Sequence, residues 1–268
     1  MPVAPEWHDL TLWFGELRLR ADYGLTEWLA VDLVWSLRTE VVRFVLRDFA
    51  TMAPIVPPYG GVDLHHRSET LVGPTDPRLA LAATRTLGAW SFRVSAGVTL
   101  PLGSTVPNPF ELGDEGKVHE HIQFGTGTLD PIAEVGVRRD GERVSVEGWL
   151  SAKASLYENG YGYRAGDQLM GGVRAASDLG LGAWRFLLGV IAYREWAERW
   201  SGLTESEGNL GRTDLLLETA ITWRFTTPWS ATLSVRLPLV TWAVGEQLTT
   251  SAIGELAIAR SFDLLGGP

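Results

Sequence analysis

The stretch RVSVEGWLSAKASLY, residues 143–157, determines how the rest of the chain is interpreted. Its even positions, from Val144 to Leu156, are apolar or small, and its odd positions are mostly polar, such as Glu147 and Lys153. This alternation predicts a β-strand with one apolar and one polar face. The pattern spans fifteen residues, whereas strands of soluble proteins usually have about five or six.

The same alternation recurs along the chain, and no segment shows a convincing helical period. Eleven strands are predicted, at about 9–23, 28–43, 78–87, 91–101, 130–139, 143–157, 164–176, 184–196, 213–225, 229–242 and 251–263. Short connections such as RDGE (139–142), with its Asp-Gly hairpin signal, alternate with long loops. The long loops lie near 46–75, 102–129 and 198–212. Short turns at one end and long loops at the other are typical of outer-membrane barrels.

We therefore predict an all-β fold, a transmembrane up-and-down antiparallel β-barrel of about twelve strands, formed by residues 1–268 as a single domain. Twelve is expected because bacterial single-chain barrels have even strand numbers. The apolar positions change parity at Gly15, between Phe14 and Leu17. We expect a β-bulge there, and we expect the unassigned strand in the same region.

A membrane environment explains both the strand length and the positions of the tryptophans. Crossing a bilayer obliquely takes about nine to eleven residues, and extensions beyond the membrane add more. Trp28, Trp90, Trp184, Trp223 and Trp229 lie near the short turns, as in an interfacial girdle. The alternative is a soluble barrel or sandwich, whose apolar faces would point inward. Strands of this length in eleven consecutive segments would be unusual in such a protein.

Composition excludes several classes of protein. The absence of cysteine excludes disulfides and thiolate metal ligands. The net charge of −9 argues against a nucleic-acid partner. No apolar run approaches the length of a helical membrane span. The first residues, MPVAPEWHDL, do not resemble a signal peptide, so the chain is either an intracellular protein or a mature form.

Three segments carry a resemblance to a known family. They are ADYGLTEWLAV (21–31), HHRSETLVGPTDP (65–77) and FGTGTLDPIAEVGV (124–137). They resemble a family of Gram-negative outer-membrane barrels that is labelled transporter-like or as a phenol-degradation MetA-pathway protein. The resemblance spans most of the chain and implies an outer-membrane location and passage of small solutes, aromatic ones among them. Two departures are the missing signal peptide and a C-terminus that continues past Phe262.

If the apolar faces meet lipid, the alternate residues line a charged lumen. The predicted lumen and selectivity residues are Arg18, Arg20, Arg93, Glu134, Arg138, Glu147, Lys153, Arg174, Arg185, Glu218, Arg224 and Arg236. One interpretation is a ladder of arginine–carboxylate pairs that braces the barrel, because buried charges require partners. The other is a polar channel whose unpaired arginines select anionic or hydrogen-bonding solutes.

The five histidines all fall in the first half of the chain, four of them as two pairs. One pair is His65 and His66, and the other is His119 and His121 in VHEHI. In an extended chain, the second spacing places both imidazoles on one face, where they could chelate one ion. Two pairs on adjacent outer loops could hold zinc, copper or nickel at the mouth. Otherwise they are polar loop residues, and no other cofactor is expected.

The function predicted from these features is a passive channel or transport protein for small molecules. Its partners would be the lipid bilayer and a small-molecule solute, with no nucleic acid, and we expect a monomer. The alternative is a barrel-anchored surface binding protein with the histidine-based metal site. A soluble lipid or pigment binder is a further possibility. A rim hydrolase using Ser68, His66 and Glu69 is not expected, because adjacent residues do not form a nucleophile elbow.

Overall fold

A computed structural model describes residues 6–56, 67–226, 228–245 and 248–262. Its strands are β1 (Glu6–Gly24), β2 (Leu29–Asp48), β3 (Glu69–Pro74), β4 (Arg78–Leu87), β5 (Trp90–Thr99), β6 (Asp130–Asp140), β7 (Val144–Lys153), β8 (Tyr163–Arg164), β9 (Gln168–Ser177), β10 (Trp184–Glu195), β11 (Arg199–Trp200), β12 (Arg212–Thr226), β13 (Trp229–Ala243) and β14 (Ile253–Arg260). One short helix, α1 (Pro109–Asp114), departs from the predicted all-β chain. Among the described residues, no helix has the length and apolar character needed to cross a bilayer.

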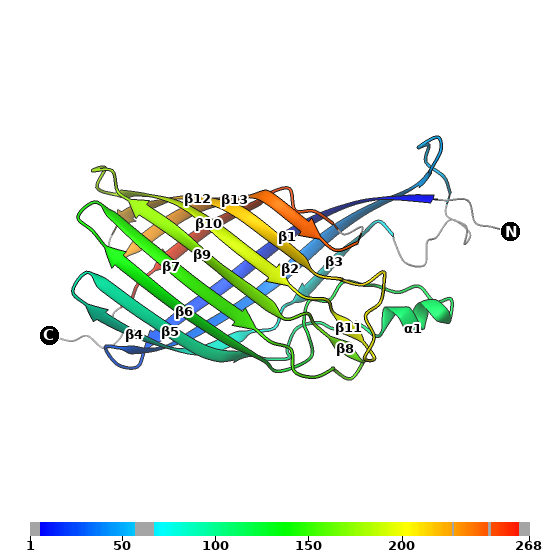
Figure 1. The fold of residues 1–268 in the computed structure, drawn as a ribbon, viewed down its shortest axis with the longest axis horizontal. Helices are drawn as coiled ribbons and strands as arrows, with labels where there is room; N and C mark the ends of the chain where they lie inside the picture. Colours follow the sequence, from blue (N-terminus) through cyan, green and yellow to red (C-terminus); the bar gives the residue numbers. More distant parts are fainter. Residues whose placement is uncertain (1–5, 57–66, 227, 246–247, 263–268) are drawn as a thin grey trace.

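The strands form one antiparallel meander. Its order is β1-β2-β4-β5-β6-β7-β9-β10-β12-β13-β14, and β3 also pairs with β2, which makes a twelve-stranded sheet. The tilted strands wrap into a barrel with short turns at one end and long loops at the other (Figure 1). The small β8–β11 sheet and α1 lie at the long-loop end. The predicted up-and-down transmembrane barrel is confirmed.

The twelfth strand is β3, inside the segment that was predicted to be a loop at 46–75. β3 and β4 pair with consecutive stretches of β2, so that β3 extends the line of β4 toward the long loops. The line breaks between Pro74 and Arg78. Pro77 lies in this break, and proline has no N–H with which to continue the ladder.

The prediction of a bulge at Gly15 is wrong. The register of β1 against β2 runs without a shift from Glu6 opposite Asp48 to Gly24 opposite Ala30. Leu12 and Glu16 therefore lie on the same face of β1. The residues on this face change from apolar to polar at Gly15 because the surroundings of the face change along the strand. On the part of β2 toward the long loops, Val42 and Leu46 are buried, so the hairpin packs apolar residues there.

Strand β7 is shorter than the alternating sequence pattern at 143–157 that predicted it. β7 has ten residues and ends at Lys153, whereas β1 and β2 have nineteen and twenty. Beyond Lys153 the backbone N–H of Ser155 donates to the Asp167 carboxylate at 2.8 Å, which turns the chain into an outer loop. The small residues after β7 continue the alternation without continuing the strand.

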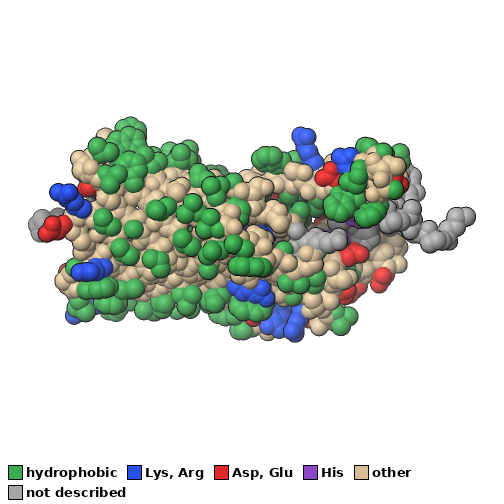
Figure 2. All heavy atoms as spheres, turned by 45° about the horizontal axis from the view of Figure 1, so that its top comes forward, with side chains coloured by type: hydrophobic (Ala, Val, Ile, Leu, Met, Phe, Trp, Pro, Cys, Tyr) green, Lys and Arg blue, Asp and Glu red, His purple; other side chains and the backbone are tan. Residues whose placement is uncertain are grey.

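The two faces of the sheet settle the choice between membrane and soluble barrels. On one face Val94, Val173 and Leu188 are 57%, 60% and 59% exposed. On the other face Asp32 and Glu218 are each 5% exposed. Figure 2 shows hydrophobic side chains over the middle of the barrel, with charged side chains toward its ends. A soluble barrel would bury its apolar face, whereas an exposed apolar belt requires lipid.

Aromatic side chains gather at the short-turn end, as predicted. The rings of Trp184 and Trp223 stack with centroids 5.6 Å apart, and Phe225 lies 5.0 Å from Trp223. The Arg260 guanidinium lies 5.1 Å from the Trp229 ring. These amphipathic rings and cations are suited to the headgroup level of a bilayer.

An arginine on the apolar face tests the orientation of the wall. Val94→Arg, in the middle of β5, is expected to cost about 2–4 kcal/mol of folding free energy in lipid vesicles, because the charge lies near the midplane. Val144→Arg, on the same face near the short turns, should cost about 0–1 kcal/mol. Urea titrations followed by tryptophan fluorescence measure both. Equal, small costs of about 0.5 kcal/mol would indicate a face in water.

Candidate functional site

The strand registers place all twelve predicted lumen residues on one face of the sheet. They are Arg18, Arg20, Arg93, Glu134, Arg138, Glu147, Lys153, Arg174, Arg185, Glu218, Arg224 and Arg236. Side chains on this face bridge across an intervening strand. Arg93 on β5 contacts Asp32 on β2, and Arg185 on β10 contacts Ser145 on β7. Side chains on this face therefore converge, and this is the face predicted to line the lumen.

Most of the lumen charges are held in arginine–carboxylate pairs. Arg174 donates to both oxygens of Glu147 at 3.0 and 3.3 Å, and Arg93 pairs with buried Asp32. Arg236 Nε donates to Glu218 at 3.0 Å. Burying a charged group such as the Glu218 carboxylate is costly unless a cation and hydrogen bonds replace water. These three pairs agree with the interpretation that arginine–carboxylate pairs brace the barrel wall.

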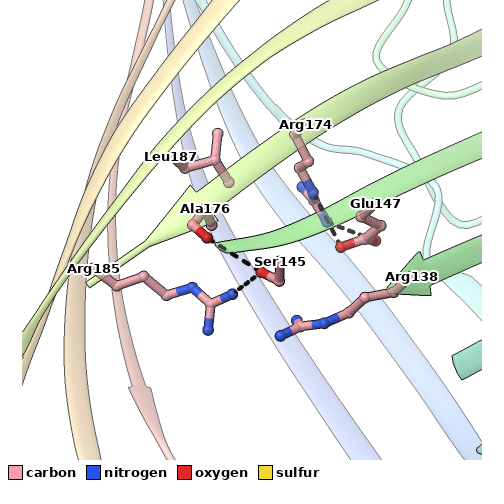
Figure 3. Close-up of a pocket in the computed structure, with 7 residues that line it drawn as sticks. All are labelled: Arg138, Ser145, Glu147, Arg174, Ala176, Arg185 and Leu187. Atoms are coloured by element: carbon pink, nitrogen blue, oxygen red, sulfur yellow. Dashed lines mark hydrogen bonds and ion pairs between the residues drawn. The ribbon is translucent and has the colours of Figure 1, made fainter. Parts of the chain in front are cut away.

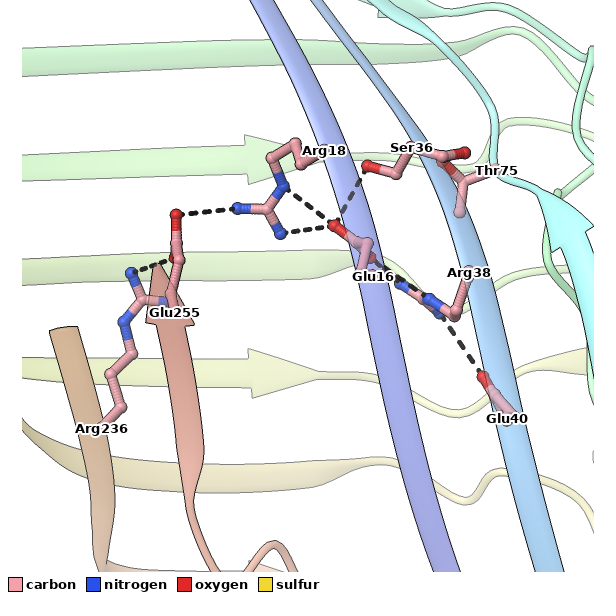
Figure 4. A network of polar contacts seen from close by, with 8 residues as sticks. All are labelled: Glu16, Arg18, Ser36, Arg38, Glu40, Thr75, Arg236 and Glu255. Atoms are coloured by element: carbon pink, nitrogen blue, oxygen red, sulfur yellow. Dashed lines mark hydrogen bonds and ion pairs between the residues drawn. The ribbon is translucent and has the colours of Figure 1, made fainter. Parts of the chain in front are cut away.

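A larger network joins the first and last strands of the meander (Figure 4). The Glu16 carboxylate on β1 accepts hydrogen bonds from Arg18 at 2.7 Å, Ser36 at 3.0 Å and Arg38 at 3.0 Å. Arg18 also lies 3.9 Å from Glu255 on β14. Within the described part of the sheet, β14 and β1 share no hydrogen-bonded ladder, so these side chains link its two ends.

A second group of charges surrounds a cavity of about 210 Å³ near the short turns (Figure 3). Its lining residues are Arg138, Ser145, Glu147, Arg174, Ala176, Arg185 and Leu187. Arg138 donates to Asp140 at 2.6 and 2.9 Å, and Arg185 donates to the hydroxyl of Ser145. Sequence reasoning did not identify Ser145, which reads only as one more polar position of its strand.

At the opposite end, Asp76 anchors the outer loops to the barrel. Its carboxylate accepts hydrogen bonds from the N–H groups of Gly103 at 2.8 Å and Thr126 at 2.6 Å, and from the Thr126 hydroxyl at 2.9 Å. One residue thus fixes both ends of the long 102–129 segment. Its only signal in the sequence is the GPTDP turn (73–77), which predicts a break but not its distant partners.

The predicted loops 102–129 and 198–212 fold against each other instead of standing apart. The ring of Trp200 on β11 lies 4.7 Å from Tyr163 on β8 and 6.1 Å from Phe110 on α1. Burial raises the pKa of Glu198, whose carboxylate accepts a hydrogen bond from the Trp200 indole at 3.1 Å. A small apolar core therefore orders the mouth.

The structure brings His119 and His121 together, with ring centroids 5.1 Å apart. His119 Nδ1 lies 2.9 Å from the Lys117 carbonyl oxygen. His65 and His66 lie outside the described residues, so the predicted site of four histidines stays a prediction. Within the described ranges, no group of three or more His, Cys, Asp or Glu residues is arranged to hold a metal ion.

Ser68, considered above as a hydrolase nucleophile, is engaged by the backbone. Its hydroxyl accepts a hydrogen bond from Phe44 N–H at 3.0 Å and lies 3.3 Å from the Phe44 carbonyl oxygen. These contacts tie the start of β3 to β2, which gives Ser68 a structural role.

A pair of carboxyl groups lies beside the histidines. Arg67 donates to Glu69 at 3.0 Å and to the His119 carbonyl at 3.0 Å, and it also pairs with Glu120. Burial raises the pKa of Glu120 to about 8, and a hydrogen bond with Glu69 adds to the rise. One cation shared between two carboxyl groups favours a single proton on the pair.

This pair makes the attachment of the loop dependent on pH. Because the pKa of Glu120 is raised from 4.5 to about 8, its stabilising contribution is full below pH 4.5 and is lost as pH rises through about 8. Segment 117–122 should therefore exchange its amide hydrogens faster at pH 9 than at pH 6, after correction for intrinsic rates. Glu120→Gln should remove this difference.

The control for this prediction is Glu115→Gln, which removes an exposed carboxylate paired with Lys117 at 2.5 Å. It should leave the pH dependence unchanged. An exchange difference that persists in Glu120→Gln would contradict the assignment.

Comparison with known proteins supports the fold. No protein-family model and no curated protein matches the chain. The crystal structure of the COG4313 outer membrane channel from Pseudomonas putida F1 matches with a TM-score of 0.59 and 12% identity, covering 93% of this chain and 82% of that one. The fold is that of an outer-membrane β-barrel.

A second similar structure is OmpTdeltaL8, a loop L8 deletion mutant of OmpT, an outer membrane protein of Vibrio cholerae. It matches with a TM-score of 0.42 and 10% identity, covering 94% of this chain and 97% of that one. At this score no inference rests on the likeness. At 12% identity, the first match supports the architecture alone.

Proposed function

We propose that the chain is a passive channel or transport protein for small molecules in the outer membrane of a Gram-negative bacterium. The observation that carries this proposal is the division of the barrel wall into an exposed apolar face and a charged concave face. A charged interior can hold water and polar solutes, as a channel requires. The protein acts as a monomer, without an enzymatic role, and its partners are the bilayer and the solute.

Two further observations support a channel. The charges of this face pair with neighbours on the same or an adjacent strand, as Arg138 does with Asp140 and Arg174 on β9 does with Glu147 on β7. Short-range pairing of this kind keeps the side chains close to the wall. The COG4313 protein, which has a similar fold, is an outer membrane channel. A relation to the transporter-like or phenol-degradation MetA-pathway family is part of the same proposal, and it suggests small aromatic solutes.

Single-channel recording tests the proposal. Purified protein in a planar bilayer should give discrete conductance steps, because a polar lumen admits water and ions. Insertion is verified separately by flotation of the same protein with lipid vesicles. A silent bilayer with fully inserted protein would contradict the channel.

A second candidate function, metal binding at the mouth, is favoured by the 5.1 Å separation of the His119 and His121 rings. Neutral imidazoles suit zinc, copper and nickel. In this case the barrel holds a surface site, and an open lumen is not needed.

Calorimetric titration with Zn²⁺, Cu²⁺ or Ni²⁺ tests the second candidate. About one ion per chain should bind, and the double variant His119→Ala/His121→Ala should lose that binding. His8→Ala on β1 removes a histidine from another element and serves as the control. Unchanged binding in the double variant would exclude the site.

A further inference from the structure

The arginines around the cavity near the short turns differ in their partners. Arg174 and Arg138 each have a carboxylate, Glu147 and Asp140 respectively. Arg185 stretches from β10 over β9 to the Ser145 hydroxyl on β7. Across the described ranges, no carboxylate lies within ion-pair distance of Arg185. Figure 3 shows its guanidinium extended beside Ser145 and facing the region of Arg138.

The charges of this region leave one positive charge uncompensated. The cavity and the space that adjoins it toward the short turns are lined by Arg138, Arg143, Arg174, Arg185 and Arg224, and by Asp140, Glu142, Glu147 and Asp178. Five guanidiniums thus face four carboxylates. Asp140 is bound by Arg138 and Glu147 by Arg174. Of the three arginines that line the cavity itself, Arg185 is the one without a described carboxylate within ion-pair distance.

The shape and lining of the cavity suit a small organic anion. Its volume of about 210 Å³ exceeds that of a few water molecules. Leu187 and Ala176 provide an apolar wall beside the guanidinium of Arg185. A planar guanidinium fork binds a carboxylate through two parallel hydrogen bonds. The Ser145 hydroxyl donates to the Ala176 carbonyl at 3.4 Å and accepts from Arg185, so Arg185 is the group that meets the anion.

We propose that this cavity is a binding subsite for a small monocarboxylate, held by Arg185 at the short-turn end of the lumen. One uncompensated charge matches a monoanion, and the apolar wall accommodates its hydrocarbon part. An inorganic phosphate dianion has no hydrocarbon part to contact Leu187, and among the described residues Arg185 is the one arginine of the cavity lining without an ion-paired carboxylate. Solutes would reach the subsite through the proposed channel, so this inference rests on that proposal. It adds small monocarboxylates as a class of solute.

Direct binding tests the subsite without relying on conduction. Equilibrium dialysis of the detergent-purified full chain uses benzoate as the probe, with acetate and inorganic phosphate as competitors. Benzoate should bind, acetate should compete weakly, and phosphate should not compete at equal concentration. Arg185→Gln should weaken benzoate binding by about tenfold or more, because a charge-assisted bidentate contact is lost.

Two variants keep this test decisive. Arg85→Gln removes an arginine from β4 at the same end of the barrel but on the lipid side, and it should bind benzoate like the wild type. Arg185→Lys keeps the charge without the fork and should restore part of the affinity. The resistance of folded barrels to unfolding in detergent on unheated gels verifies that each variant is folded.

The outcomes separate the subsite from the channel. Benzoate binding that Arg185→Gln leaves intact, or that Arg85→Gln weakens equally, would overturn the subsite, as would equal competition by phosphate. A silent bilayer together with Arg185-dependent binding would overturn the channel and leave the subsite standing. Conductance without benzoate binding would overturn the subsite alone.

Discussion

The hydrogen-bonded ladder between neighbouring strands is the constraint on which the structure depends. In the hydrocarbon layer no water can satisfy a backbone N–H or C=O group, so each must pair with the next strand. A meander of antiparallel neighbours meets this requirement with short turns on one side, which is the order found from β1 to β14. The ladder also fixes the faces, because residues that are opposite in register point to the same side.

Once one face is committed to lipid, most charges of the wall fall on the other face, and Arg85 on the lipid side lies near the short turns. On the concave face, ion pairs offset the desolvation cost of the charged side chains, as in Arg236 with Glu218 and Arg174 with Glu147. The network around Glu16 links β1 to β14 by side chains. Arg185 is an exception to this pairing. It has a hydroxyl where Arg138 and Arg174 have a carboxylate, and this difference is the basis of the proposed subsite.

The predictable and unpredictable parts of the fold differ in the range of their contacts. Alternation is local, so the sequence predicted eleven strands and placed residues such as Arg93 and Glu218 on the lumen side. Contacts between distant residues were not predictable. Asp76 binds Gly103 and Thr126, which orders a segment that reads as an open loop. The break at Pro77 concealed β3, and the parity change at Gly15 reflected a change of surroundings within an unbroken register.

The channel requires that the apolar face of the wall meets lipid and that the charged face meets water inside the barrel. The chain has no cysteine, so a nitroxide spin label can be attached at one introduced cysteine at a time from Val144 to Lys153. Its relaxation by oxygen, which dissolves in lipid, and by a polar nickel complex, confined to water, is then measured in vesicles. We expect opposite oscillations of the two relaxation rates with a period of two residues, with the oxygen effect strongest at even positions. Nickel access that is strongest at the even positions would contradict it.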